Sequence, residues 1–425
     1  MGNDLETKKQ VYADLLIRSG VNLQEGQSLR IGAELAHREF VRQVVAAAYE
    51  AGAEYVQVDW IDTPTAKQRF LHSRPEFLDY YPGYEVGRHE YMLAEKWARL
   101  ALVGPEFPNV FDDVDPEAMR RTALARSKLI KFYMDRTMAN DIQWCVAAVP
   151  TPAWAKQVFP DLAEAEAVDR LWQTVMETCR VYQPDPVAAW LEHAEALTRL
   201  LDFLAKKKVR SVHFVDSRVD DAGKPLTDLT VGLTDHPVWI GAGSATPDGV
   251  EFFANMPTEE IFSTPHNQRT QGWARITKPA YPFEREVRDA WFHFEDGEVV
   301  EYGAGTGKKV LDELFAIDGA RRLGEVALVD LSSPINQSGL LFYETLFDEN
   351  ATCHIAFGNA YPDGVEGGSN MEAEALAEAG VNSSPAHVDV MIGSATMNVT
   401  GECADGSTVA IMENGRFVPE ATGGV

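Results

Sequence analysis

The pattern of apolar positions predicts a strand, a helix and a second strand near the start of the chain. Short apolar runs at residues 28–32 and 53–60 are typical of strands. Between them, apolar side chains recur at helical spacing, which predicts a helix over residues 38–51 with one buried face. A helix that joins two strands over about 30 residues forms a βαβ unit, so the sequence predicts a parallel sheet.

The same alternation continues beyond this unit. Further helices are expected at residues 8–19, 116–127, 162–178 and 186–207, and further strands at 100–103, 143–149 and 209–215. This succession predicts an α/β N-terminal domain with a parallel, doubly wound sheet over residues 1–230. Because no Gly-x-Gly-x-x-Gly follows the first strand, we assign it no dinucleotide and interpret it as a scaffold that shapes the substrate site or forms a dimer.

The pattern changes after the last of these strands. Asp, Gly, Thr and Pro accumulate over residues 216–247 and helical periodicity disappears, which indicates a domain boundary. Beyond it, strands are expected at residues 278–281, 289–294, 299–302 and 408–417, with a hairpin turn at 295–298 and a helix at 308–317. The sequence therefore predicts an α+β C-terminal domain over residues 231–425. Two domains also agree with a length of 425 residues, above the roughly 250–300 at which single cores stop growing.

Composition excludes several classes of protein. The formal charge of −27, from 65 acidic and 38 basic residues, argues against a nucleic-acid partner and against anionic membranes. The four cysteines, Cys145, Cys179, Cys353 and Cys403, are far apart and form no Cys-x-x-Cys pair, so a disulfide framework is not expected. The first residues are polar, and no apolar run approaches the roughly 20 residues that span a bilayer. We therefore expect a cytoplasmic protein.

Carboxylates and imidazoles of the second domain lie inside short apolar segments. Glu325 lies in an apolar run that is typical of a strand. His387 and Asp389 are two residues apart, so in an extended strand their side chains point to the same face. An uncompensated buried charge costs on the order of several kcal/mol, and a divalent metal would remove that cost.

Other oxygen and nitrogen ligands lie nearby in the sequence. His354 and Tyr361 are seven residues apart, about two helical turns, so one helix could present both to one cavity. Glu259 and Glu260 follow Pro257. Taken alone, a buried glutamate is more often an ion-pair partner and a buried histidine is more often a core residue. Together they favour a metal site, and mixed oxygen and nitrogen ligands suit zinc, cobalt or manganese better than calcium.

These segments resemble those of a known family. Residues 255–265, 323–328, 333–339, 342–358 and 387–393 are similar, in this order, to the C-terminal half of the thermophilic-type metallo-aminopeptidases. The resemblance is dense from about residue 250 to 415, and looser in layout before that. One departure is Asp330, where the family more often has proline, and it lies outside the candidate ligands.

The resemblance implies a pair of divalent metal ions, zinc, cobalt or manganese. The ligands that it implies are Glu259, Glu325, His354, Tyr361, His387 and Asp389. It also implies a two-domain subunit, a homodimer, and removal of N-terminal residues from peptides with a free N-terminus. In the adjacent pair we assign Glu259 as the ligand and Glu260 as a candidate general base, while Tyr361 either binds a metal or donates to the oxyanion.

The mechanism expected for such a site is hydrolysis by a water that two metal ions activate. Two other interpretations stay open. Another metal-dependent amidohydrolase could use the same ligands, and it would act on N-blocked substrates. A non-catalytic binding protein would tolerate the loss of Glu325 or His354.

Overall fold

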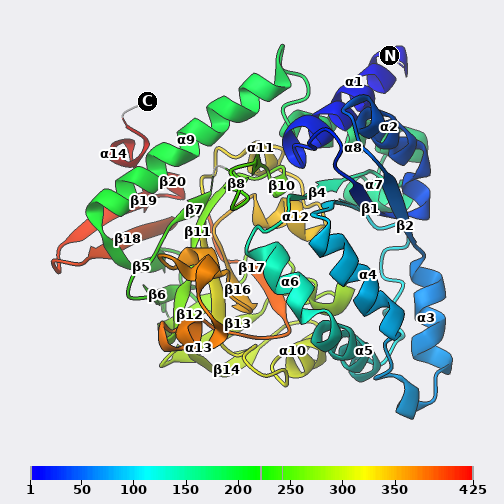
Figure 1. The fold of residues 1–425 in the computed structure, drawn as a ribbon. Helices are drawn as coiled ribbons and strands as arrows, with labels where there is room; N and C mark the ends of the chain where they lie inside the picture. The colour runs from blue at the N-terminus through cyan, green and yellow to red at the C-terminus, as the bar shows by residue number, and fades with distance from the viewer. Residues whose placement is uncertain (1, 221–222, 242, 424–425) are drawn as a thin grey trace. The chain divides into compact units, whose positions relative to one another are not determined.

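The computed structural model describes residues 2–220, 223–241 and 243–423. They form two units (Figure 1). Unit 1 comprises Met1–His193, Gly243–Thr258 and Leu340–Leu346, and unit 2 comprises Ala194–Ala242, Glu259–Gly339 and Phe347–Val425. The division falls within helix α9 (Pro186–Lys207), upstream of the Asp- and Gly-rich segment at 216–247.

Unit 1 is built on a five-stranded sheet in the order β10-β4-β3-β1-β2, in which every pair is parallel. Its strands are β1 (Leu29–Glu34), β2 (Val56–Ile61), β3 (Ala98–Val103), β4 (Trp144–Ala148) and β10 (Asn255–Met256). Its helices are α1 (Gly2–Leu15), α2 (Arg38–Glu50), α3 (Thr63–His72), α4 (Gly83–Ala94), α5 (Pro116–Leu129), α6 (Lys131–Met138), α7 (Pro152–Val158) and α8 (Glu164–Thr178). A small pair, β8 (Ser244–Ala245) and β9 (Glu251–Phe252), completes it.

Alternate residues of β1 face two different environments. Leu29, Ile31 and Ala33 are fully buried, whereas Arg30 points to the opposite face and contacts His89 of α4. Helices α1, α2 and α8 pack together through the rings of Tyr12, Phe40 and Trp172. Figure 1 shows helices on both faces of this sheet, so the parallel sheet with helical layers agrees with the prediction for the first half.

Unit 2 contains two antiparallel sheets. The first has the order β17-β16-β15-β11-β7, with strands β7 (Ile240–Gly241), β11 (Glu260–Ser263), β15 (Leu323–Val329), β16 (His354–Gly358) and β17 (His387–Met391). The second has the order β14-β13-β12-β6-β5-β18-β19-β20, with strands β5 (Val209–Asp216), β6 (Asp228–Leu233), β12 (Pro265–Arg275), β13 (Trp291–Glu295), β14 (Glu298–Gly303), β18 (Met397–Cys403), β19 (Thr408–Glu413) and β20 (Arg416–Phe417). Helices α10 (Lys308–Leu314), α11 (Pro334–Gln337), α12 (Thr345–Glu349), α13 (Ala373–Glu378) and α14 (Pro419–Thr422) connect strands or end the chain. The remaining turns of helix are η1 (Leu16–Gly20), η2 (Leu35–His37), η3 (Pro75–Phe77), η4 (Pro282–Glu284), η5 (Pro362–Gly364) and η6 (Gly368–Asn370).

An aromatic cluster packs one face of the five-stranded sheet of unit 2. Phe357 of β16 lies 4.7 Å from Phe292 and 6.1 Å from Phe294, both on β13 of the other sheet, and 5.1 Å from Phe315, measured between ring centroids. Alternate residues of a strand point to opposite faces. His354, Ala356 and Gly358 are therefore directed away from this core.

Two predicted strands differ from the structure. The strand at 209–215 was expected in the parallel sheet of the first domain, but β5 pairs antiparallel with β6 and β18 in unit 2. The propensity of a strand does not specify its partner, so the sequence pattern alone misplaced it. Residues 278–281 form no regular strand, since only Ala280 makes an isolated bridge, with Val287.

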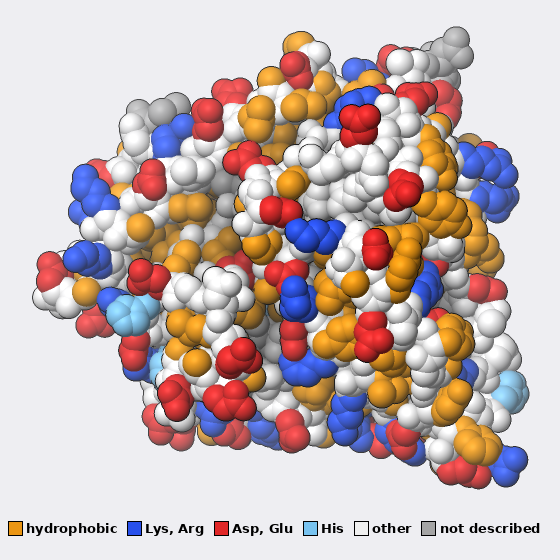
Figure 2. Space-filling view, in the orientation of Figure 1, with side chains coloured by type: hydrophobic (Ala, Val, Ile, Leu, Met, Phe, Trp, Pro, Cys, Tyr) orange, Lys and Arg blue, Asp and Glu red, His pale blue; other side chains and the backbone are white. Residues whose placement is uncertain are grey.

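Acidic and basic side chains are interspersed over the face shown in Figure 2. Such mixing limits the local repulsion that a formal charge of −27 would otherwise produce. Within the described ranges, no helix combines the length and the apolar character needed to cross a bilayer.

Asp216, at the end of β5, is a buried acceptor whose loss is expected to destabilise unit 2. Its side chain is 1% exposed and accepts hydrogen bonds from Arg218, Thr396 and Ser394. Although burial opposes ionisation, these hydrogen bonds lower the pKa of Asp216 to about 2. A depressed carboxyl pKa stabilises the folded state above the unfolded value near 4, and this stabilisation is lost as the pH falls from about 4 towards 2.

We expect Asp216→Asn to lower the free energy of unfolding by about 2 kcal/mol at pH 7. The difference from wild type should shrink in urea titrations at pH 4 and pH 3. The matched control is Asp202→Asn on α9, which removes an exposed carboxylate of the same unit. A difference that stayed constant over this pH range would contradict the assigned role of the charge.

Candidate metal centre

Four neighbouring strands of unit 2 direct polar side chains to one face of their sheet. Glu325 of β15 is opposite Ala356 of β16, and Ala356 is opposite Asp389 of β17. Residues directly opposite each other in an antiparallel pair share a face. His354 lies two positions from Ala356 and His387 lies two positions from Asp389, so both histidines point to this same face.

Glu260 joins them from β11. It is opposite Val329, which lies four positions from Glu325 on β15, so its side chain is on the same face. The glutamates and His354 are almost completely buried, with exposed fractions of 7% for Glu260, 4% for Glu325 and 1% for His354. Four strands therefore direct five ionisable side chains to the same region on one face of the sheet.

Glu325 stands between the two histidines. Its Oε1 lies 3.4 Å from Nε2 of His354, and its Oε2 lies 3.5 Å from Nε2 of His387. Glu260 is 3.0 Å from the first imidazole and Asp389 is 3.5 Å from the second. Two donor groups result, Glu260–Glu325–His354 and Glu325–His387–Asp389, in each of which the ligand atoms lie within 4.8 Å of one another.

Backbone carbonyls fix the tautomers of both histidines. Nδ1 of His354 is 3.1 Å from the carbonyl oxygen of Glu349, and Nδ1 of His387 is 2.8 Å from that of Asn359. Because a carbonyl oxygen only accepts, each Nδ1 must carry the proton and donate it. Each Nε2 therefore faces the carboxylates and is the atom that would bind a metal ion, as in metal-bound histidines.

Small residues make space on this face of the sheet. Ala356 lies between Glu325 and Asp389, and Gly358 lies opposite His387. Gly358 has a φ of 100°, and a Cβ there would clash with the carbonyl oxygen of Ala386. The glycine is therefore required both by its backbone conformation and by the close approach of β17.

The pKa values reflect the crowding of charges. Burial raises the pKa of Glu325, and the nearby charges of Glu260 and Asp389 raise it further. Burial also opposes protonation of His354, yet Glu260 and Glu325 raise its pKa well above the usual value. Carboxylates this close and this buried need a cation, and mixed carboxylate and imidazole donors suit divalent zinc, cobalt or manganese. The residues present therefore fit a metal centre.

His354 and Tyr361 were expected on one helix, and this expectation is wrong. His354 begins strand β16, and Tyr361 follows the strand in the turn that leads into η5. The ring of Tyr361 still reaches the site, since its centroid lies 5.4 Å from that of His387. Burial raises the pKa of its hydroxyl well above 10, as do the charges of Glu325 and Asp389.

Of the two adjacent glutamates, Glu260 lies in a donor group with His354. Glu259 immediately precedes β11 and belongs to neither donor group. Its backbone N–H donates to the side chain of Asn350 at 2.7 Å. Only Glu260 of this pair lies in β11, and its carboxylate is 3.0 Å from Nε2 of His354. The ligand role of Glu259 and the general-base role of Glu260 stay predictions from the sequence.

Sequence reasoning missed Glu349, the last residue of α12. Its carboxylate is buried, and burial raises its pKa well above the usual value, with further increases from the charges of Asp389 and Glu260. Its backbone carbonyl is the acceptor for Nδ1 of His354. The sequence feature that could have indicated Glu349 is a carboxylate within the apolar segment at 346–361. Its spacing from the other candidate ligands, however, does not relate it to them.

Cys353 is a core residue. Its Sγ lies 3.6 Å from Sδ of Met412, and burial raises the pKa of the thiol to about 11. A reactive cysteine needs a lowered pKa, so Cys353 has a role in packing.

Comparison with known proteins extends the resemblance over nearly the whole chain. The model of the thermophilic metalloprotease (M29) family matches residues 5–417. Aminopeptidase 2 of Geobacillus stearothermophilus is 39% identical over 98% of this chain and 99% of its own length. Aminopeptidase PepS of Streptococcus thermophilus is 41% identical over 96% of this chain and 97% of its own length.

A solved structure has the same fold. Wild-type AmpT from Thermus thermophilus superimposes with a TM-score of 0.86 at 37% identity, covering 97% of this chain and 99% of that chain. With the ligand geometry above, these matches establish that the chain belongs to the thermophilic metalloprotease (M29) family and is a metallo-aminopeptidase.

Proposed function

We propose that this aminopeptidase holds two divalent metal ions that share Glu325, and that it removes the N-terminal residue of peptides with a free α-amine. The observation that carries this proposal is the position of Glu325, whose two carboxylate oxygens face two different histidines. One carboxylate that belongs to two donor groups is suited to bridge two ions. Glu260 and His354 would complete one group, and His387 and Asp389 the other.

When bound, such a pair of ions polarises the scissile carbonyl and lowers the pKa of the attacking water. The chain supplies the remaining functions. We assign Glu349, a buried carboxylate outside both donor groups, to accept the proton of that water and return it to the leaving amine. As the bond from oxygen to carbon forms and the bond from carbon to nitrogen breaks, the proton ends on the released amine.

Tyr361 is assigned to stabilise the oxyanion. Its hydroxyl is kept neutral by burial and by the surrounding carboxylates, so it can donate a hydrogen bond to an oxygen that gains negative charge.

The experiment that tests this proposal removes and restores the metal. Purified protein is stripped with a chelator and assayed on aminoacyl-arylamide substrates before and after addition of zinc, cobalt or manganese. We expect activity to disappear on stripping and to return with metal, and an N-acetylated substrate to remain uncleaved. Cleavage of the N-acetylated substrate at a comparable rate would instead favour a general amidohydrolase.

A further inference from the structure

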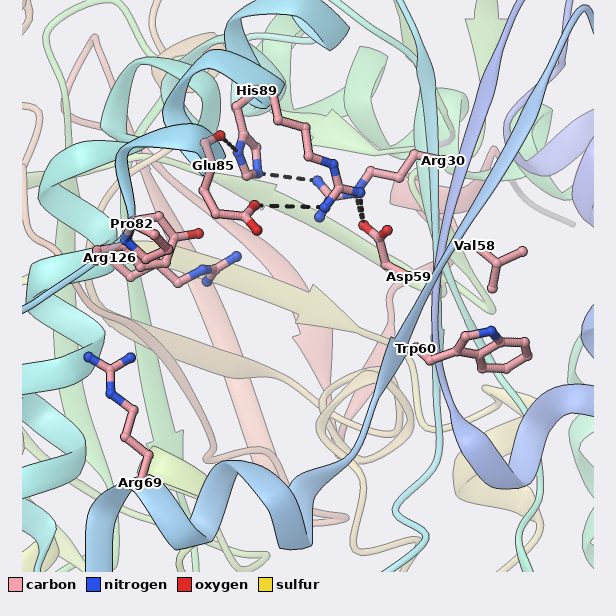
Figure 3. A pocket seen from close by; sticks show the side chains of 11 residues that line it. Arg30, Val58, Asp59, Trp60, Arg69, Pro82, Glu85, His89 and Arg126 are labelled. Atoms are coloured by element: carbon pink, nitrogen blue, oxygen red, sulfur yellow. Dashed lines mark hydrogen bonds and ion pairs between the residues drawn. The ribbon is translucent and has the colours of Figure 1, made fainter. Parts of the chain in front are cut away.

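Unit 1 contains a cavity of about 540 Å³ whose lining includes none of the metal-centre residues. It lies at the polar face of the parallel sheet, and helices α3, α4 and α5 contribute to its lining (Figure 3). Four arginines line it, Arg30, Arg69, Arg88 and Arg126, together with two carboxylates, Asp59 and Glu85. For a chain with a formal charge of −27, an arginine-lined cavity is unexpected.

The two carboxylates are already engaged. Asp59 accepts from Arg30 at 2.7 Å and also forms an ion pair with Arg88. Glu85 lies 3.7 Å from the same Arg88. Asp59 and Glu85 therefore compensate Arg30 and Arg88, and the charges of the other two arginines remain.

Arg69 and Arg126 have no acidic partner among the described residues. Arg69 donates to the backbone carbonyls of Phe77 and Leu78, which orient the guanidinium without neutralising it. Over the same part of the chain, the side chain of Arg126 makes neither a hydrogen bond nor an ion pair, and it points from α5 towards the space beside Glu85 (Figure 3). The cavity thus has an excess of two positive charges.

The groups next to these arginines do not offset this excess. His89 accepts from Arg30 through Nε2 at 3.2 Å, and its Nδ1 is 2.6 Å from the carbonyl oxygen of Glu85, to which it must donate. It is therefore neutral, and burial lowers its pKa in agreement. Arg99 of β3 is the register partner of Arg30, so two guanidinium groups lie on one face of adjacent strands.

The lining favours an oxyanion over an apolar ligand. Side chains of Val58 and Trp60 point to the other side of β2 from Asp59, so the arginine side of the cavity is polar (Figure 3). Guanidinium groups from separate elements can donate to several oxygens at once, as a tetrahedral phosphate requires. Two uncompensated charges match a phosphate group, which carries about −1.5 to −2 charges at pH 7, better than a single carboxylate.

We propose that this cavity binds a phosphate group, either as inorganic phosphate or as a phosphomonoester of a small molecule, through Arg69 and Arg126. Both arginines belong to unit 1, and neither belongs to the metal centre. The site therefore stands independently of the proposed two-metal mechanism.

The test is isothermal titration calorimetry on the metal-loaded, full-length protein at low ionic strength, with inorganic phosphate and with glycerol 3-phosphate as probes. We expect saturable binding that weakens by at least about tenfold in Arg69→Gln/Arg126→Gln, since hydrogen bonds to charged groups are lost. The matched control is Lys128→Gln, which removes an exposed charge from the same helix α5 and should change the affinity by less than about twofold.

Each outcome decides the proposal. Tighter binding of glycerol 3-phosphate would identify a phosphorylated small molecule as the ligand, and tighter binding of inorganic phosphate would identify the free ion. Absence of binding would overturn the proposal. Binding that is unchanged in the double variant would also overturn it, and would place phosphate elsewhere, for example on the metal ions. Circular dichroism and thermal melting of the variants distinguish a lost site from a lost fold.

Discussion

Replacing Glu325 by glutamine is expected to abolish both activity and metal binding while the chain stays folded. Glu325 is the one side chain common to both donor groups, with an oxygen 3.4 Å from His354 and another 3.5 Å from His387. An amide keeps the shape of the side chain, but it offers one neutral oxygen in place of two charged ones. We therefore expect kcat to fall roughly a thousandfold, which corresponds to about 4 kcal/mol of lost transition-state stabilisation.

Metal content measured on the same samples separates this explanation from misfolding. Wild-type protein should retain two ions per chain after gel filtration, and Glu325→Gln should retain fewer than one. The matched control is Glu301→Gln, an exposed carboxylate on β14 of the same unit, for which we expect unchanged activity and metal content. If Glu325→Gln kept two ions and more than a tenth of the activity, Glu325 would not be the shared ligand.

Parts of this site were predictable because they depend on one strand only. Glu325 lies in an uninterrupted apolar run, and all seven residues of β15 are buried. His387 and Asp389 are two apart, and β17 places them on one face as expected. For His387 and Asp389, the period of two in a strand was sufficient for the prediction.

Other parts depend on neighbours in space. A spacing of seven between His354 and Tyr361 fits two helical turns, but the register of β16 between β15 and β17 makes it a strand followed by a turn. The choice between Glu259 and Glu260 depends on the residue at which β11 begins, and strand ends are poorly specified by local sequence. Glu349 reaches the site only because α12 ends beside β16.

The arginine-lined cavity of unit 1 could not be predicted from the sequence for the same reason, since its residues are far apart in the chain. Arg30, Arg69 and Arg126 come from β1, α3 and α5, and nothing in their sequence spacing relates them. Only the parallel sheet and the helices over its polar face bring them together. The net charge of −27 gave no indication of a local excess of positive charge.

Single histidine variants are expected to remove one metal ion each. His354 belongs only to the group with Glu260, and His387 belongs only to the group with Asp389. His354→Ala should therefore empty one position and His387→Ala the other, while Glu325 and the remaining ligands retain the second ion. Titration of zinc into chelator-stripped protein should change from two equivalents per chain in wild type to one in either variant.

Activity should fall at least about a hundredfold in each histidine variant, because both ions act on the same carbonyl and water. The activity of the double variant should be only slightly lower than that of the less active single variant, since groups that act as a unit give non-additive losses. His293→Ala, on β13 in the other sheet of unit 2, is the control and should bind two equivalents with wild-type activity. One equivalent in wild type, lost in both histidine variants, would instead indicate a single ion held by both imidazoles, and Glu325 would then be a terminal ligand and not a bridge.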